Sequence, residues 1–271
     1  MGALIQSTIF GRSKMANIFY REKANHDLLI QMYTSFSPDG TKLYATLHNG
    51  PDSVAQYSLS TPWDVTTAKY LGQSVAINQN GESQPRGHFI SSDGTKLFVS
   101  GTSSSSVLYF TLLIPWDVST ASYIGSKSFG STNSIAFSSD GLSFFNHTTF
   151  SLAKYSLSTA WDLNTASLIT SQNIDFSSNS FFFDPDGNAI FYPRLNGDRS
   201  VVKILLKAPY DLSGPYTITS IDLSPVIPAI NFYAVTLSPN GLKMYWSSYR
   251  TSVYEFDLSK PFVIDAKLVV I

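Results

Sequence analysis

Two stretches decide the fold of this 271-residue chain: FSPDGTKLY at residues 36–44 and YSLSTPWDV at residues 57–65. In the first, Pro38 and Asp39-Gly40 form a tight-turn signal, because proline fixes φ and glycine accepts a positive φ. The apolar runs on either side have the length and alternation of β-strands. The second stretch ends another strand-like run and closes on an aromatic corner at Trp63.

Both signatures occur five times along the chain. The turns are Asp39-Gly40, Asp93-Gly94, Asp140-Gly141, Asp186-Gly187 and Asn240-Gly241, and the corners centre on Trp63, Trp116, Trp161, Tyr210 and Phe262. The turn-to-turn steps of 54, 47, 46 and 54 residues are typical of a radial or stacked repeat. Each unit contains four short antiparallel strand signals, which predicts an all-β, five-bladed β-propeller over residues 27–271. Six blades are the alternative if residues 1–26 pair with a further partner.

The first stretch and its second copy, SSDGTKLFV at residues 91–99, resemble the blade motif of lactonase-like and TolB-like β-propellers. The resemblance implies blade geometry over residues 28–271 but no single function, since those families include enzymes, cell-surface proteins and protein-binding modules. YSLSTPWDV returns nearly intact as YSLSTAWDL at residues 155–163. This unit is similar to repeats in predicted bacteriophage structural and tail-associated proteins, and it implies a virion setting.

Composition excludes several classes of function. A net charge of −1 and a charged fraction of only 14% give no electrostatic footprint for nucleic acid. The absence of cysteine excludes disulfides and thiolate metal sites. No apolar run approaches the roughly 18 residues of a membrane span, and the first residues lack the pattern of a signal peptide. We therefore expect a virion or extracellular protein without membrane insertion.

The repeat divides the predicted propeller into two faces. The Asp-Gly turns and the corners share one face, which we assign to the scaffold, and the remaining connections share the face that we expect to carry the site. The corner aromatics are interpreted as wedges between blades, with a ligand-stacking ring as the alternative. The inner strands carry mainly apolar or small residues at one repeat position, so we predict no metal and no cofactor; these residues are Ser35, Phe89, Ala136, Phe182 and Thr236.

Candidate binding residues lie where the repeat fails. Arg86 and His88 enter an inner strand, and His88 has either a ligand-contacting or a structural, hydrogen-bonded role. The segment PRLNGDR at residues 193–199, together with the next blade, predicts an anion or sugar site, since arginine forks recognise carboxylates. A solvated hairpin loop is the alternative for it. The residues of this second group are Arg194, Asn196, Asp198, Arg199, Tyr249 and Arg250.

Residues 1–26 stand outside the repeat and carry four basic residues, namely Arg12, Lys14, Arg21 and Lys23. Because Ala266–Ile271 already reads as the fourth strand of the fifth blade, the ring does not require a strand from the N-terminus. Three alternatives follow: an edge strand added to a blade, a cap over the pore, or a basic arm that docks to a larger assembly, which is slightly favoured.

The prediction for function is a non-enzymatic interaction module. Its expected partners are other virion proteins or a host surface receptor, either protein or glycan. No Gly-x-Ser-x-Gly elbow and no His-Glu-x-x-His pair occurs in the chain. Two alternatives stay open: a lactonase-like hydrolase that uses the central channel, and a sugar-binding propeller.

Overall fold

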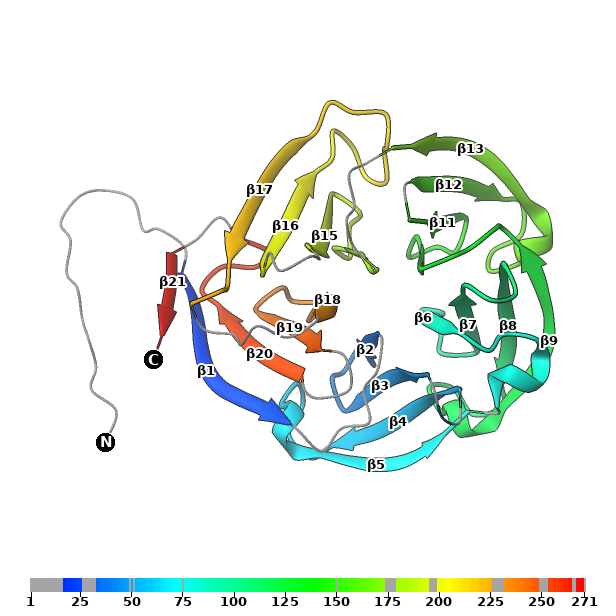
Figure 1. The fold of residues 1–271 in the computed structure, drawn as a ribbon, viewed down its shortest axis with the longest axis horizontal. Helices are drawn as coiled ribbons and strands as arrows, with labels where there is room; N and C mark the ends of the chain where they lie inside the picture. The colour runs from blue at the N-terminus through cyan, green and yellow to red at the C-terminus, as the bar shows by residue number, and fades with distance from the viewer. Residues whose placement is uncertain are drawn as a thin grey trace.

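The computed structural model describes residues 17–25, 33–48, 50, 52–74, 76–149, 151–173, 179–194, 199–225, 232–248, 253–264 and 267–270. Within these residues, five small sheets surround a common centre and form a five-bladed β-propeller (Figure 1). The predicted fold class and blade number are confirmed, and the six-bladed alternative is wrong. No helix in this part of the chain has the length and apolar character needed to span a membrane.

The first four blades each contain four consecutive antiparallel strands, ordered from the centre outward. Blade one consists of β2 (Thr34–Phe36), β3 (Lys42–Leu47), β4 (Ser53–Leu59) and β5 (Ala68–Gln73). Blade two consists of β6 (Pro85–Ile90), β7 (Lys96–Gly101), β8 (Ser106–Leu112) and β9 (Ala121–Ser128). Blade three consists of β10 (Ser134–Phe137), β11 (Ser143–His147), β12 (Leu152–Leu157) and β13 (Ala166–Gln172). Blade four consists of β14 (Phe182–Phe183), β15 (Ala189–Pro193), β16 (Ser200–Leu205) and β17 (Thr217–Asp222).

Blade five differs because an N-terminal strand enters it. Its order is β18 (Phe232–Leu237), β19 (Lys243–Ser248), β20 (Val253–Leu258), β1 (Asn17–Asn25) and β21 (Lys267–Val270). β1 pairs antiparallel with β20 and parallel with β21, so the fourth place belongs to the N-terminal strand and β21 lies outside it (Figure 1). The prediction that residues 266–271 form the fourth strand is therefore wrong. For residues 17–25, strand pairing is the alternative observed; residues 1–16 lie outside the described part.

The turn and the corner of each unit form one packing contact. The corner aromatics adopt positive φ values between 56 and 66°, a conformation that bulky residues rarely take. Each corner amide donates a hydrogen bond to the carbonyl of its own turn glycine, as Trp63 does to Gly40 at 3.0 Å. The ring then covers that glycine so closely that a Cβ there would lie under 3.0 Å from it. Glycine is thus required both by the positive φ of the turn and by the lack of space for a Cβ beneath the ring.

Short 3₁₀ helices follow the first three corners, and the corner aspartate caps each of them. These helices are η1 (Val65–Thr67), η3 (Val118–Thr120) and η4 (Leu163–Thr165), and a fourth, η2 (Ile77–Asn80), lies between blades one and two. The Asp64 carboxylate accepts a hydrogen bond from the Thr66 amide at 3.1 Å, and Asp117 and Asp162 do the same in their units. These aspartates thus bind local backbone amides, as aspartate commonly does in turns.

One position on the third strand connects each blade to the corner of the next. Gln56 and Glu255 accept from a backbone amide at the corner, and the tyrosine accepts from a side-chain amide. The lysines donate to a corner carbonyl. The five contacts are Gln56 with Val118 N (2.9 Å), Tyr109 with Asn164 Nδ2 (3.1 Å), Lys154 with Tyr210 O (3.0 Å), Lys203 with Phe262 O (2.9 Å) and Glu255 with Val65 N (3.4 Å).

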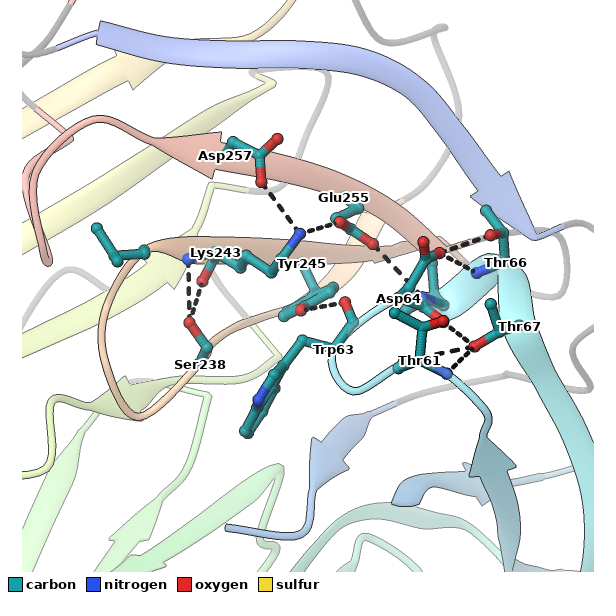
Figure 2. Close-up of polar contacts among 12 residues, drawn as sticks. Thr61, Trp63, Asp64, Thr66, Thr67, Ser238, Lys243, Tyr245, Glu255 and Asp257 are labelled. Atoms are coloured by element: carbon teal, nitrogen blue, oxygen red, sulfur yellow. Dashed lines mark hydrogen bonds and ion pairs between the residues drawn. The ribbon is translucent and has the colours of Figure 1, made fainter. Parts of the chain in front are cut away.

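Figure 2 shows the last of these contacts, where blade five meets blade one. The Tyr245 hydroxyl donates to the Trp63 carbonyl at 2.7 Å, and Glu255 accepts from the first amide after Asp64. Lys243 forms ion pairs with both Glu255 and Asp257. β1 completes blade five, and the contacts of Tyr245 and Glu255 join blade five to blade one. The ring is therefore closed by residues from both ends of the chain.

Candidate functional site

A cavity of about 310 Å³ lies at the centre of the ring. Inner-strand residues of all five blades line it, and Figure 1 shows β2, β6 and β18 next to this centre. Turn residues such as Ser92, Ser139 and Pro239 also belong to its wall. The cavity therefore reaches the turn-and-corner face, which the sequence analysis assigned to the scaffold.

The wall of the cavity is mainly aromatic. It includes rings from the inner strands of four blades and rings from three of the corners; these residues are Tyr33, Phe36, Phe89, Phe137, Phe181, Phe182, Phe183, Trp63, Trp116 and Tyr210. Polar groups are few, with Ser35 and His88 in contact among the inner strands and Asp184 in a turn. A mostly apolar wall with a few fixed polar groups is the usual make-up of a small-molecule pocket.

The corner rings serve as wedges between blades, as predicted. Trp161 stacks on Phe89 of blade two at 5.9 Å and packs against Phe137 of its own blade at 5.2 Å. Tyr210 lies between Phe145 of blade three and Phe183 of blade four in the same way. Three of the corner rings, Trp63, Trp116 and Tyr210, are half-buried and line the cavity wall.

His88 lies on β6 and is only 1% exposed. Its Nε2 is 2.7 Å from the Ser35 hydroxyl, and its Nδ1 is 2.8 Å from the Thr46 hydroxyl, so both ring nitrogens bind side chains of blade one. Burial lowers the pKa of His88 to about 3, which keeps the imidazole neutral at pH 7. With both nitrogens engaged, this histidine connects two blades and presents no lone pair to a metal ion.

Asp184 is the residue that the sequence analysis missed. It occupies the first position of the fourth turn, where the other four units carry Ser37, Ser91, Ser138 and Ser238. In those units the serine hydroxyl accepts a hydrogen bond from the amide five residues later, and Asp184 accepts the equivalent bond from Ala189 at 3.0 Å. The signal was present in the sequence, as a carboxylate at a position that is otherwise serine.

The substitution changes the electrostatics of the turn. Each serine also donates to the acidic or amide side chain two residues later, for example Ser138 to Asp140 at 2.6 Å. An ionised Asp184 has no hydroxyl proton to donate, and Asp186 follows it as a like charge. Burial, with a smaller contribution from Asp186, raises the pKa of Asp184, whereas the hydrogen bond from Ser138 lowers the pKa of Asp140.

The predicted arginine sites are only partly described. Arg86 is half-buried at the β-bulge that begins β6, but it does not line the cavity. Arg194 is exposed after β15 and Arg199 is half-buried before β16, and their backbones pair with Ser200 and Leu223. Asn196, Asp198, Tyr249 and Arg250 lie outside the described residues. The anion or sugar site therefore stays a prediction.

The connection at residues 78–88 contains a buried carboxylate. Glu82 is fully buried and accepts hydrogen bonds from the hydroxyl groups of Ser103 (2.5 Å) and Ser104 (2.7 Å), and from the Gln84 amide (2.6 Å). Burial alone would raise the pKa of Glu82, but these hydrogen bonds outweigh it and the pKa is lowered. Glu82 thus anchors this connection to the β7–β8 loop and is not directed at a ligand.

Within the residues that the structure describes, no group of three or more His, Cys, Asp or Glu side chains could hold a metal ion. No family model matches the chain, and no curated protein matches it. Comparison with solved structures gives many matches.

Three of the matched structures are compared with this chain by sequence identity, coverage and TM-score. Hydrazine synthase of Kuenenia stuttgartiensis is 19% identical, with 82% of this chain and 56% of that chain covered and a TM-score of 0.45. A candidate 6-phosphogluconolactonase from Bacteroides uniformis is 14% identical, with 80% and 62% covered and a TM-score of 0.44. A protein from Lactobacillus plantarum is 14% identical, with 89% and 66% covered and a TM-score of 0.46.

This chain spans 56 to 66% of the length of these three proteins. One of the three is a lactonase by name, and none of the three is named as a virion protein. The bacteriophage setting gains no support from them. At such low identity and TM-score, the likenesses say nothing about activity or ligand, so the site must be interpreted from its own residues.

Proposed function

We propose that the chain is a binding module that takes a small molecule into its central channel. The observation that carries this proposal is the cavity of about 310 Å³, whose wall is mainly aromatic and includes a few polar groups. Pockets for small ligands generally begin at about this volume. The non-enzymatic part of the sequence prediction is kept, while its virion partner rests on the sequence resemblance alone.

Binding is favoured over catalysis because the polar groups of the channel are committed to the fold. At the cavity wall, His88 is held by the hydroxyl groups of Ser35 and Thr46, so Ser35 and His88 are bonded to each other. A group that connects two blades is costly to rearrange during a reaction, since buried polar groups that lose their partners cost about 1–3 kcal/mol each.

The test uses a position where the repeat itself supplies both variants. Ala136 lines the cavity, and the equivalent residue is phenylalanine in blades two and four but serine in blade one. Ala136→Phe should fill the cavity with a side chain that the fold accepts elsewhere, and Ala136→Ser is the matched control.

The probe is N-phenyl-1-naphthylamine, a neutral apolar fluorophore. We expect saturable, one-to-one binding to the unmodified chain and to Ala136→Ser, and at least tenfold weaker binding to Ala136→Phe. Equal binding to all three proteins, or no binding to any, would overturn the proposal.

A second candidate function, ester or lactone hydrolysis, is favoured by one contact. The Ser35 hydroxyl is 2.7 Å from His88 Nε2 at the cavity wall, which is the geometry of a nucleophile with its base. Thr46 occupies the place of the orienting carboxylate, however, and an imidazole whose pKa is about 3 is a weak base.

Hydrolysis of p-nitrophenyl acetate and of γ-butyrolactone separates the two candidates. Turnover that is abolished by both Ser35→Ala and His88→Gln, with probe binding retained, would establish catalysis. If the chain only binds, we expect Ser35→Ala and His88→Gln to give the same hydrolysis rate as the control variant Ser92→Ala. The control removes an exposed serine at the cavity mouth.

A further inference from the structure

Among the described residues that line the channel, one carries an acidic side chain. Among the described residues that line the cavity, Asp184 is the one that is ionised near pH 7, since His88 is neutral and the remainder are apolar, aromatic or hydroxyl-bearing. Asp184 is half-buried at the wall that the fourth turn supplies. The cavity therefore has a negative end within an aromatic enclosure.

The scaffold does not need this charge. In four of the five turns a serine makes the backbone contact that Asp184 makes in the fourth, at 2.9, 2.9, 2.8 and 3.0 Å from the amide. Serine would also restore the donor that Asp186 lacks, because each of those serines donates to the side chain two residues later. The carboxylate is thus a departure from the repeat that costs the turn a hydrogen bond.

The protein supplies Asp184 with little compensating charge. Lys203 is the cation that acts on it, and the Lys203 ammonium is directed to the Phe262 carbonyl at 2.9 Å and lies over the Phe191 ring. No salt bridge to Asp184 is formed by any residue in the described part of the chain. A ligand with a positive charge would supply the missing partner.

Aromatic rings surround the same space. Phe182 and Phe183 precede Asp184 directly, and Tyr210 packs edge-on against Phe183 at 5.2 Å. The faces of aromatic rings attract cations, and an alkylated ammonium ion loses less hydration energy in such a place than a small hard cation does. A carboxylate beside several rings therefore selects an organic ammonium group over both a metal ion and a neutral apolar molecule.

We propose that the central channel binds an organic cation, with a substituted ammonium group held between Asp184 and the aromatic wall. This inference rests on the proposed binding function and names its ligand class. An anionic ligand is disfavoured by the same carboxylate, and a neutral ligand leaves Asp184 with hydrogen bonds from backbone amides but no salt bridge.

The test compares two molecules of nearly equal shape, choline and its neutral carbon analogue 3,3-dimethylbutan-1-ol. Both are titrated as competitors of bound N-phenyl-1-naphthylamine at pH 7.5. Asp184→Ser introduces the residue of the other four turns, and Asp186→Asn, an exposed position in the same turn, is the matched control.

We expect choline to displace the probe at a concentration at least tenfold lower than the alcohol. Asp184→Ser should abolish that preference, and Asp186→Asn should keep it. A lack of preference in the unmodified chain, or a preference that survives Asp184→Ser, would overturn the inference while probe binding keeps the proposed function intact. Loss of probe binding in every protein would instead overturn the proposed function.

Discussion

The third and fourth turns of the propeller have the same backbone but opposite electrostatics. In the third turn, Ser138 donates to Asp140 and accepts from the Ser143 amide, so the first turn residue acts as both donor and acceptor. In the fourth turn, Asp184 keeps the backbone contact and brings a second carboxylate next to Asp186. Both turns pack their glycine under a corner ring.

The difference separates what the fold requires from what it tolerates. Glycine under the ring and an acceptor at the first turn position are required, because all five units have them. A charge at the first position is not required, and it occurs in a turn residue that lines the cavity. A residue that departs from the repeat therefore indicates a function when the common residue would fill the same structural role.

The third and fourth turns belong to a closed ring of five blades, and removal of β1 would break that ring. We expect deletion of residues 1–25 to lower the free energy of unfolding by an amount on the order of 5 kcal/mol, comparable to the stability of a whole domain. The reason is that β20 loses its outer partner and β21 loses the strand it pairs with. Urea unfolding measures this.

Deletion of residues 1–16, which keeps β1, is the control. A shorter chain lacking residues 1–25 that unfolds at the same urea concentration as this control would show that β1 is not needed for closure.

The turn glycines give the next largest effect. Gly141→Ala should cost about 2–4 kcal/mol, because a Cβ would overlap the Trp161 ring and φ is +72°. Gly130→Ala has a similar φ of +83° but nothing within 4 Å, so it should cost only about 1 kcal/mol. Equal losses in chemical denaturation would mean that the ring contact contributes nothing beyond the backbone conformation.

Exchange of the first turn residues sharpens the comparison directly. Ser138→Asp should destabilise the protein by about 1 kcal/mol at pH 7, since Asp140 loses a donor and gains a like charge. Asp184→Ser should stabilise it by up to about 1 kcal/mol for the opposite reason. Thermal unfolding of both variants checks the signs, and a loss of stability in Asp184→Ser would show that the fourth turn requires its carboxylate.

The smallest effect is a pH dependence of opposite sign in the two turns. The pKa of Asp140 is lowered by folding, so its ionised form contributes stability that is lost as the pH falls through that value. The pKa of Asp184 is raised, so its ionised form costs stability above that pKa, and protonation relieves the cost as the pH falls.

At pH 7, Asp184→Asn should therefore raise the free energy of unfolding, and the gain should shrink as the pH falls and Asp184 becomes protonated. Asp140→Asn should lower it at pH 7. Parallel unfolding curves between pH 3 and pH 7 compare the two variants, and a gain in Asp184→Asn that grows toward low pH would have the wrong sign.

The repeat made most of the fold predictable from the sequence. Asp-Gly turns and aromatic corners specify local φ values, hydrogen bonds and packing within about 25 residues, so the unit and its number could be derived from them. The order of strands in blade five could not, because β1 (NIFYREKAN) comes from outside the repeat and its place between β20 and β21 depends on the closed ring.

The site was less predictable for a similar reason. The contact of His88 with Ser35 and Thr46 joins blades whose facing residues are 42 and 53 positions apart, and only the ring geometry brings them together. Asp184 could have been found, since aligning the five turns exposes a carboxylate where serine is usual. Its turn otherwise obeys the repeat, whereas the loops that differ between blades are more conspicuous in the sequence.

The central claim is that an ammonium group lies inside the aromatic channel next to Asp184. The most direct measurement is the proton NMR spectrum of choline titrated with the protein, because ring currents shift methyl protons held close to aromatic faces. The account predicts an upfield shift of the N-methyl signal that saturates with protein concentration and disappears in Asp184→Ser. An N-methyl signal that does not move, or that moves equally in the Asp184→Ser protein, would contradict it.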